Sequence, residues 1–201
     1  MNDVSSRTTT PGGGSVAALV GALSTSMASM SANFTLGKDR FRDVEPKIRE
    51  ILENSNNGRE DLLRLMEEDI EAYNEVVRAY SLPKSSDEEK EQRSSAIQNG
   101  MKKAIDVPLR TMNCTLKLLK YINELVKIVN PNLITDIGVG GLLADAAFRG
   151  AMLNVEYNLN YIKDKEMVDS IKEEIVRDMD RANGLIGDFM LNVKERMHRA
   201  A

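Results

Sequence analysis

Apolar residues recur at every third or fourth position along most of the chain, which is the spacing of one face of an α-helix. No segment alternates apolar and polar residues over the several positions that a half-buried strand requires. The pattern therefore predicts an all-α protein. Helices are expected over about 15–36, 46–80, 86–105, 106–129, 135–162 and 166–197. Five or six helices of unequal length are typical of a helical bundle or a layered helical subunit.

Local signals predict where these helices begin and which faces they bury. Ser15 is placed to cap the first helix, and Ser86 with Glu89 has the spacing of a capping box. Because proline disrupts a helix interior, Pro108 predicts a kink or a restart near Asp106. Two apolar stripes are expected to face the core: Leu62, Met66, Ile70, Tyr73, Val77 and Tyr80, and Ile171, Ile175, Met179, Ala182, Ile186, Phe189 and Val193.

Composition narrows the class of protein. The 201 residues suffice for one sizeable core, so a single domain over 1–201 is expected. The formal net charge is -4, and no basic field exists to hold a nucleic-acid backbone or an anionic membrane surface. Cys114 is the only cysteine, which suits a reducing compartment. We therefore expect a cytoplasmic protein that binds neither nucleic acid nor membrane.

The segment from Thr8 to Gly37 contains no charged residue and raises the question of a membrane span. Twelve of the eighteen residues over 15–32 are Gly, Ala, Ser or Thr, whereas a spanning helix is dominated by larger aliphatic residues. Burial within protein is therefore predicted. Small side chains let helix backbones approach closely, either inside one subunit or across a dimer interface.

A glycine-rich turn precedes this first helix. Gly12, Gly13 and Gly14 follow Pro11 and lead directly into the helix at Ser15. Backbone N–H groups at such a helix start point outward at the positive end of the helix dipole, where an anion can bind. The turn lacks the lysine of a phosphate-binding P-loop and no strand precedes it. An anion cradle and a plain flexible helix entry are both compatible with the sequence.

Three polar residues, Asn33, Thr35 and Lys38, lie at the opposite end of the same helix. Lys38 is suited to hold a carboxylate or to donate a proton, although a solvated surface lysine is the more common outcome. Asp136 begins a long uncharged run, and a carboxylate in such apolar surroundings is a candidate for acid-base chemistry. The alternative is a first-turn acid that stabilises a helix dipole.

The sequence offers few residues that could bind a metal ion. His198 is the only histidine and lies near the end of the printed sequence, and no Glu-x-x-His pair of the kind found in ferritin-like sites occurs. The eleven methionines are spread over several helix faces and are interpreted as core residues. We therefore predict no metal site.

Several short motifs occur in an order that resembles the formimidoyltetrahydrofolate cyclodeaminase and methenyltetrahydrofolate cyclohydrolase family. The similarity covers roughly residues 10–164. The motifs are Thr10-Pro11-Gly12-Gly13-Gly14-Ser15-Val16-Ala17-Ala18-Leu19, Ala32-Asn33-Phe34-Thr35-Leu36-Gly37-Lys38, Asp43-Val44-Glu45, Ala79-Tyr80-Ser81-Leu82-Pro83-Lys84, Val107-Pro108-Leu109, Asn130-Pro131-Asn132, Thr135-Asp136-Ile137-Gly138-Val139, Arg149-Gly150-Ala151, Leu153-Asn154-Val155 and Asn158.

The resemblance implies an all-helical homodimer that binds a reduced folate and uses no metal or redox cofactor. In the cyclodeaminase reaction, a folate nitrogen attacks the formimidoyl carbon of 5-formimidoyltetrahydrofolate, and ammonia leaves to give 5,10-methenyltetrahydrofolate. In the cyclohydrolase reaction, water opens the methenyl ring to a formyl product. Both reactions pass through a tetrahedral carbon between two nitrogens and need proton transfer.

The resemblance also assigns candidate roles to residues. Asp136 is predicted to be the acid-base carboxylate, and Lys38 with the glycine turn is predicted to hold anionic or polar parts of the folate. The predicted substrate-binding residues are Gly12, Gly13, Gly14, Ser15, Asn33, Thr35, Arg149 and Asn154. Cyclodeaminase is the leading interpretation and cyclohydrolase the alternative. A third possibility, from a different class, is a non-catalytic helical assembly or folate-binding module.

Overall fold

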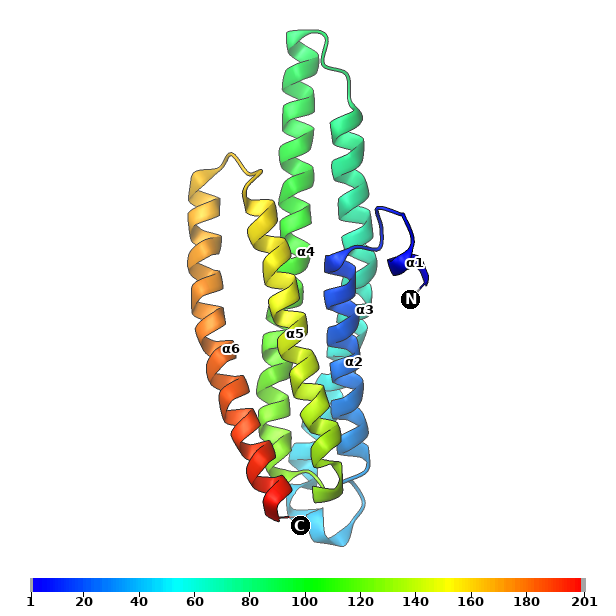
Figure 1. The fold of residues 1–201 in the computed structure, drawn as a ribbon, viewed down its shortest axis with the longest axis vertical. Helices are drawn as coiled ribbons and strands as arrows, with labels where there is room; N and C mark the ends of the chain where they lie inside the picture. Colours follow the sequence, from blue (N-terminus) through cyan, green and yellow to red (C-terminus); the bar gives the residue numbers. More distant parts are fainter. Residues whose placement is uncertain (1, 200–201) are drawn as a thin grey trace.

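The computed structural model describes residues 2–199, which form six α-helices, two short 3-10 helices and no strand (Figure 1). The all-α prediction is confirmed. The elements in chain order are α1 (Asn2–Ser5), α2 (Gly13–Asn33), η1 (Asp39–Val44), α3 (Glu45–Ser81), α4 (Asp87–Ile128), η2 (Pro131–Leu133), α5 (Ile134–Leu159) and α6 (Lys165–Arg199).

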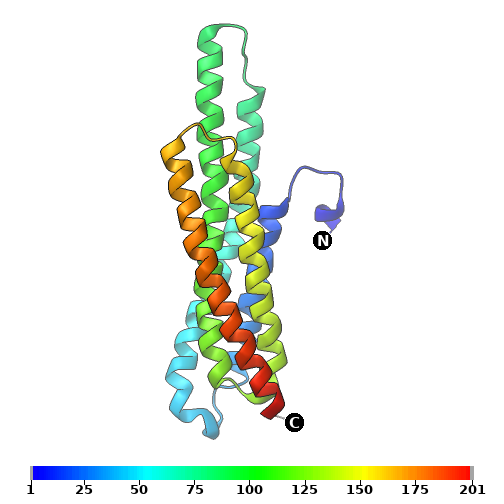
Figure 2. The ribbon, with the colours of Figure 1, turned by 60° about the vertical axis from the view of Figure 1, so that its left-hand side comes forward.

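Helices α2 to α5 pack as an antiparallel group of four, in which α2 lies between α3 and α5, and α4 lies between the same two helices. Helix α6 packs against α4 and α5. The hairpin of α3 and α4 extends well beyond the first residue of α2 in both views (Figures 1 and 2). The space in line with α2 beyond its first residue is therefore flanked by α3, α4 and α5.

Helix α2 packs closely on α5 through small residues. The Ser24 hydroxyl donates a 2.6 Å hydrogen bond to the Gly140 carbonyl, and a Cβ on Gly140 would lie only 3.1 Å from Cβ of Met27. Helix α2 is long and apolar enough to cross a membrane by length and composition, but 61% of its most apolar window is buried within the fold. The predicted burial of this helix within protein is confirmed.

The predicted restart near Asp106 is wrong, because α4 is a single helix that continues through Pro108. Proline has no backbone N–H, so the carbonyl four residues earlier, that of Ala104, loses its helical donor. The Asn158 side chain of α5 donates a 2.8 Å hydrogen bond to this carbonyl. A neighbouring helix thus satisfies the acceptor that the proline leaves open, and α4 continues.

Two other expectations need correction. Ser15 does not cap α2, since the helix begins at Gly13 and has no side-chain cap. Of the stripe predicted for α3, Tyr73, Val77 and Tyr80 are 40–48% exposed. The buried residues of that part of α3 are Leu62, Leu65, Ala72, Val76 and Ala79.

Two other local predictions are confirmed. The Ser86–Glu89 capping box is present, and the apolar stripe of α6 is buried or half-buried.

Apolar side chains also cover an outward side of α2 and α5, which we call the α2–α5 face. Leu23 and Leu142 are each 51% exposed, and Leu153 is 62% exposed. The face consists of Val16, Val20, Leu23, Met27, Met30 and Phe34 along α2 and its end, and of Val139, Leu142, Ala146, Leu153 and Tyr157 on α5.

The contact between α5 and α6 gives a stability prediction. A Cβ on Gly141 would lie 2.1 Å from the buried Phe189 ring, whereas a Cβ on Gly187 of α6 meets no atom within 4 Å. We expect Gly141→Ala to lower the free energy of unfolding by about 1–3 kcal/mol. Gly187→Ala should raise it by up to about 1 kcal/mol, since alanine favours a helix. Urea denaturation measures both, and an equal response of the two variants would contradict this packing.

Candidate functional site

A cavity of about 270 Å³ lies at the first turn of α2. It forms there because α2 begins at Gly13, while α3, α4 and α5 continue past that level (Figure 1). The N-terminal segment before α2 contributes to one wall. The lining residues are Thr9, Thr10, Gly12, Gly13, Gly14, Asp69, Ala72, Tyr73, Val76, Met101, Ala104, Asn154 and Asn158.

The Asp69 carboxylate of α3 is fixed against the glycine turn. Its Oδ2 accepts a 2.7 Å hydrogen bond from the Ser15 hydroxyl. Its Oδ1 lies where a side chain on Gly14 would be, only 2.2 Å from an ideal Cβ position. Glycine is therefore required at position 14 for the carboxylate to approach the helix start. No hydrogen bond to Oδ1 is found within residues 2–199, so this oxygen can accept one from a ligand.

Two carboxamides of α5 complete the polar side of the cavity. Asn154 donates a 2.8 Å hydrogen bond to the Gly150 carbonyl, and its side-chain amide lies 3.6 Å from an ideal Cβ on Gly13. Asn158 is oriented by its hydrogen bond to Ala104. The predicted site residues Gly12, Gly13, Gly14, Ser15 and Asn154 thus lie together.

The electrostatics of the cavity differ from those of an anion cradle. The first-turn N–H groups of α2 have no partners within the helix and carry the positive end of its dipole. The chain itself supplies the negative charge there, through Asp69. A second anion would be repelled by this carboxylate at close range. The cavity is therefore suited to a polar ligand that presents N–H groups or a positive charge.

Asn33, Lys38 and Asp136 lie at the other end of the bundle. The antiparallel packing pairs Gly13 with Asn154 at one end and Thr35 with Asn130 at the other. Asn33 and Lys38 are exposed, and Asp136 is half-buried in the first turn of α5. Among residues 2–199, Lys38 and Asp136 have no side-chain hydrogen bond or ion pair. Within one chain, the structure does not bring Asp136 or Lys38 to the glycine turn.

Thr35 and Arg149 are engaged in contacts that hold the fold. The buried Thr35 hydroxyl donates to the Ser31 carbonyl at 2.7 Å and accepts from the Asn130 N–H at 3.0 Å. Arg149 donates to both Asp145 oxygens at 2.9 Å and to Asn183 of α6 at 2.8 Å. Neither residue lines the cavity at α2. These contacts hold the fold, and the predicted contact of the two residues with folate stays a prediction.

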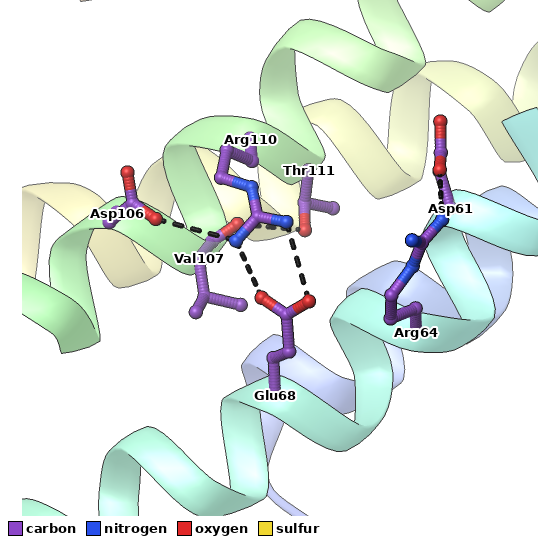
Figure 3. Close-up of polar contacts among 7 residues, drawn as sticks. All are labelled: Asp61, Arg64, Glu68, Asp106, Val107, Arg110 and Thr111. Atoms are coloured by element: carbon purple, nitrogen blue, oxygen red, sulfur yellow. Dashed lines mark hydrogen bonds and ion pairs between the residues drawn. The ribbon is translucent and has the colours of Figure 1, made fainter.

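A larger cavity of about 530 Å³ lies between α3 and α4, over Thr25 of α2. Its arginines are already paired. Arg110 bonds Glu68 and Asp106, and Arg64 pairs with Asp61 (Figure 3). Hydrogen bonding to Glu68 raises the pKa of Arg110. This cavity is a polar groove between two helices, and it contains none of the residues predicted for the site.

Cys114 lines the same groove, and burial raises the pKa of its thiol to about 11. The thiol is therefore protonated at neutral pH and a poor nucleophile. In the part of the chain that the structure describes, no three His, Cys, Asp or Glu side chains are grouped to hold a metal ion.

Asp69, Tyr73 and Asn158 were not predicted to bind substrate. Asp69 lies among several acidic residues of a long amphipathic helix, and nothing in the local sequence distinguishes it from a solvated carboxylate. The distinguishing fact is its contact with Ser15, which is 54 positions away in the chain. The only available signal was the triple glycine, which indicates that some group approaches the turn closely.

The fold and the cavity define an all-α protein with a polar cavity at the start of a buried helix. The profile of the Formiminotransferase-cyclodeaminase family matches residues 1–177. The chain therefore belongs to this family, as its motifs predicted.

Relatives that carry two different names are similar to this chain. A methenyltetrahydrofolate cyclohydrolase from Methylorubrum extorquens is 33% identical over 198 residues, which are 98% of this chain and 95% of that protein. The formimidoyltransferase-cyclodeaminase of Rattus norvegicus is 31% identical over 177 residues, or 88% of this chain. The match spans only 32% of the length of the rat protein.

A solved structure has the same fold. The crystal structure of formiminotetrahydrofolate cyclodeaminase from Thermotoga maritima matches with a TM-score of 0.87 at 31% identity. The match covers 96% of this chain and 92% of that one.

The Gly14–Asp69 contact gives a second stability prediction. In Gly14→Ala the added methyl group should displace Asp69 and break its hydrogen bond with Ser15. We expect this to lower the free energy of unfolding by about 1–2 kcal/mol. Gly184→Ala is the control, because Gly184 lies inside α6 and a Cβ there meets no atom within 4 Å. The two variants are compared by urea denaturation, and equal stabilities would show that the turn does not clamp the carboxylate.

Proposed function

We propose that this protein is a formimidoyltetrahydrofolate cyclodeaminase, which converts 5-formimidoyltetrahydrofolate to 5,10-methenyltetrahydrofolate and ammonia. The observation that carries the proposal is the Asp69 carboxylate, held by Ser15 at the glycine turn in a cavity lined by two carboxamides. The family and the names of the relatives supply the substrate class.

The charge of the cavity is complementary to the reacting group. A formimidoyl group is an amidine, which is basic and carries a positive charge when protonated. The methenyl product carries a positive charge shared by two nitrogens. A carboxylate close to this centre stabilises both species, and it does so most strongly where water is excluded. Asp69 is the only charged residue that lines the described cavity.

A single carboxylate can carry the proton through the reaction. The free folate nitrogen attacks the formimidoyl carbon, and a C–N bond forms while the nitrogen loses its proton to Asp69. The tetrahedral carbon then bears an amino group. Asp69 returns the proton to this group, the C–N bond breaks, and ammonia leaves. The methenyl cation remains, and the carboxylate is ready for another cycle.

The remaining residues of the cavity position the folate. Asn154, Asn158 and the first-turn N–H groups offer hydrogen bonds to the polar edge of the pterin ring. Tyr73, Val76 and Met101 form an apolar wall for its flat face. Asp136 remains a second acid-base candidate, and Lys38 a candidate for binding the folate carboxylates.

A cyclohydrolase is the second candidate function, and the 33% identical relative of that name over 95% of its length favours it. Asp69 would then take a proton from the attacking water and deliver it to the departing ring nitrogen. A non-catalytic folate-binding or assembly module is the third candidate. The fixed carboxylate in the cavity argues against it, because folate binding alone does not require a proton acceptor there.

The proposal also covers the oligomeric state, the location and the cofactors of the enzyme. A homodimer is supported by the exposed apolar α2–α5 face, since apolar faces of this kind mark protein interfaces. A cytoplasmic location is supported by the free Cys114. The chemistry requires no metal or redox cofactor, because each step is a proton transfer or a nucleophilic addition or elimination.

Substitution of the carboxylate tests the catalytic role. Asp69→Asn keeps an acceptor for Ser15 but removes the base, so we expect turnover to fall about 10²–10⁴-fold. Asp61→Asn on the same helix is the control and should keep wild-type turnover, because Asp61 lies in the other cavity. Steady-state assays measure both. Near-normal turnover by folded Asp69→Asn would refute the role.

Assays with the two folate substrates, followed by the methenyl absorbance, distinguish a cyclodeaminase, a cyclohydrolase and a binding module. Purified protein should generate the methenyl absorbance from 5-formimidoyltetrahydrofolate, because the product ring is the chromophore. If the protein is a cyclohydrolase, the absorbance of added 5,10-methenyltetrahydrofolate should instead fall, and its rate of loss should be well above the uncatalysed rate. If neither substrate reacts while reduced folate binds, the protein is a binding module.

A further inference from the structure

We propose that Asn158 selects the tetrahydro form of the folate, because its carbonyl oxygen is held in the cavity at α2 as an acceptor for an N–H group of the pterin ring. Pro108 has a positioning role, since it keeps the Asn158 side chain in one orientation. The identity of the ligand rests on the proposed function, whereas the geometry comes from the contacts between α4 and α5.

The side chain of Asn158 is fixed in one of its two amide orientations. Its nitrogen Nδ2 donates a 2.8 Å hydrogen bond to the Ala104 carbonyl of α4. A carbonyl only accepts hydrogen bonds, so rotation of the amide by half a turn would place two oxygens against each other. Asn158 is half-buried and lines the cavity, and its Oδ1 has no hydrogen-bond partner among residues 2–199. This oxygen is therefore available to a donor on the ligand.

Pro108 is the reason that the Ala104 carbonyl needs a donor from another helix. In a regular helix this carbonyl would accept from the N–H at position 108, where proline has none. An alanine at that position would supply the N–H and would compete with Asn158 for the carbonyl. Pro108 is buried in α4 and does not line the cavity. It therefore acts on a ligand only through Asn158.

Asn154 presents the same group one helical turn earlier on α5. Its Nδ2 donates a 2.8 Å hydrogen bond to the Gly150 carbonyl, which fixes its amide in the same way. Residues four apart on a helix lie about 5–6 Å from each other, so the two amide oxygens follow one another along the cavity wall. Oδ1 of Asp69 is also open. The carboxylate and both carboxamides of the cavity therefore offer acceptor oxygens to a ligand.

Reduced and oxidised folates differ in the hydrogen bonds that their ring nitrogens make. In a tetrahydrofolate the ring nitrogen N8 carries a hydrogen and is a donor. In fully oxidised folic acid N8 is an aromatic nitrogen with a lone pair and is an acceptor. N8 lies opposite the reacting nitrogen N5 on the same ring, and Asn158 lies one turn farther from α2 than Asn154. With Asp69 at the reacting nitrogens, N8 is the ring nitrogen that faces Asn158.

The fixed amide turns this difference into selectivity. A freely rotating carboxamide would present its NH2 group to folic acid and its oxygen to a tetrahydrofolate, and it would bind both. The bond to Ala104 prevents this exchange. With folic acid, two lone pairs face each other and Oδ1 of Asn158 has no donor. We therefore expect folic acid to bind about 10–100-fold more weakly than a tetrahydrofolate.

Titration calorimetry with two folates tests the selectivity. The ligands are 5-formyltetrahydrofolate, which has the N8 hydrogen, and folic acid, which lacks it. Wild-type protein should bind the first about 10–100-fold more tightly, and Asn158→Leu should lower this ratio about tenfold. Asn160→Leu is the control, because Asn160 is exposed at the end of α5 and lies outside the cavity; it should keep the wild-type ratio.

A purely structural role of Asn158 would weaken the binding of both folates equally and leave their ratio unchanged. An unchanged ratio in Asn158→Leu, or equal affinities of the wild type for the two folates, would therefore overturn the proposal.

A double variant separates binding from folding. Asn158→Leu leaves the Ala104 carbonyl without a donor and should lower the urea midpoint. In Pro108→Ala/Asn158→Leu the helix regains an N–H for this carbonyl, so the midpoint should recover while the binding ratio stays low. A wild-type ratio in this folded double variant would refute the role of Asn158.

The positioning role of Pro108 is tested by the same cycle. Pro108→Ala alone should lower the binding ratio about threefold, and it should have no further effect where Asn158 is already replaced. Pro46→Ala, in the first turn of α3 at the other end of the bundle, should leave the ratio unchanged. Equal effects of Pro108→Ala with and without Asn158 would show that the proline does not act through this side chain.

The outcomes separate the selectivity from the proposed function. Protein that binds the two folates with the expected ratios but turns over neither substrate refutes the enzyme and keeps the selectivity. Active protein whose ratio does not respond to Asn158→Leu refutes the selectivity and keeps the function. Protein that binds neither folate refutes both.

Discussion

The contact between Gly14 and Asp69 is the constraint on which the site depends. A carboxylate can lie against the first turn of a helix only where no side chain intervenes, and an ideal Cβ at position 14 would be 2.2 Å from Oδ1. The Ser15 hydroxyl then fixes the other oxygen at 2.7 Å. This contact joins the first turn of α2 to α3, leaves one carboxylate oxygen without a partner among the described residues, and places a negative charge at the helix start.

The same region shows that the fold and the site share residues. Pro108 leaves the Ala104 carbonyl without a helical donor, and Asn158 satisfies it from α5. Both Ala104 and Asn158 line the cavity. Pro108 removes one backbone hydrogen bond of α4, and the bond that Asn158 makes to the freed carbonyl holds its carboxamide at the cavity. The small residues of α2 act similarly, since they allow the close approach to α5 that places Asn154 beside Gly13.

The sequence predicted the helices well because their apolar spacing and the Ser86–Glu89 capping box are local signals. It predicted the glycine turn and Asn154 as parts of one site. It missed Asp69, whose significance comes from a contact with Ser15 in a distant segment. It also misjudged Pro108, because the compensating donor belongs to another helix. Residues near each other in a motif, such as Thr35 and Lys38, proved to have different environments.

The location of the folate is the most direct test of this account. A crystal structure with a stable reduced folate, such as 5-formyltetrahydrofolate, would settle it. We predict that the pterin ring lies at the first turn of α2, with its nitrogens facing Asp69 and Asn154. Density for the pterin in the groove of Arg64 and Arg110, with the cavity at α2 empty, would contradict it.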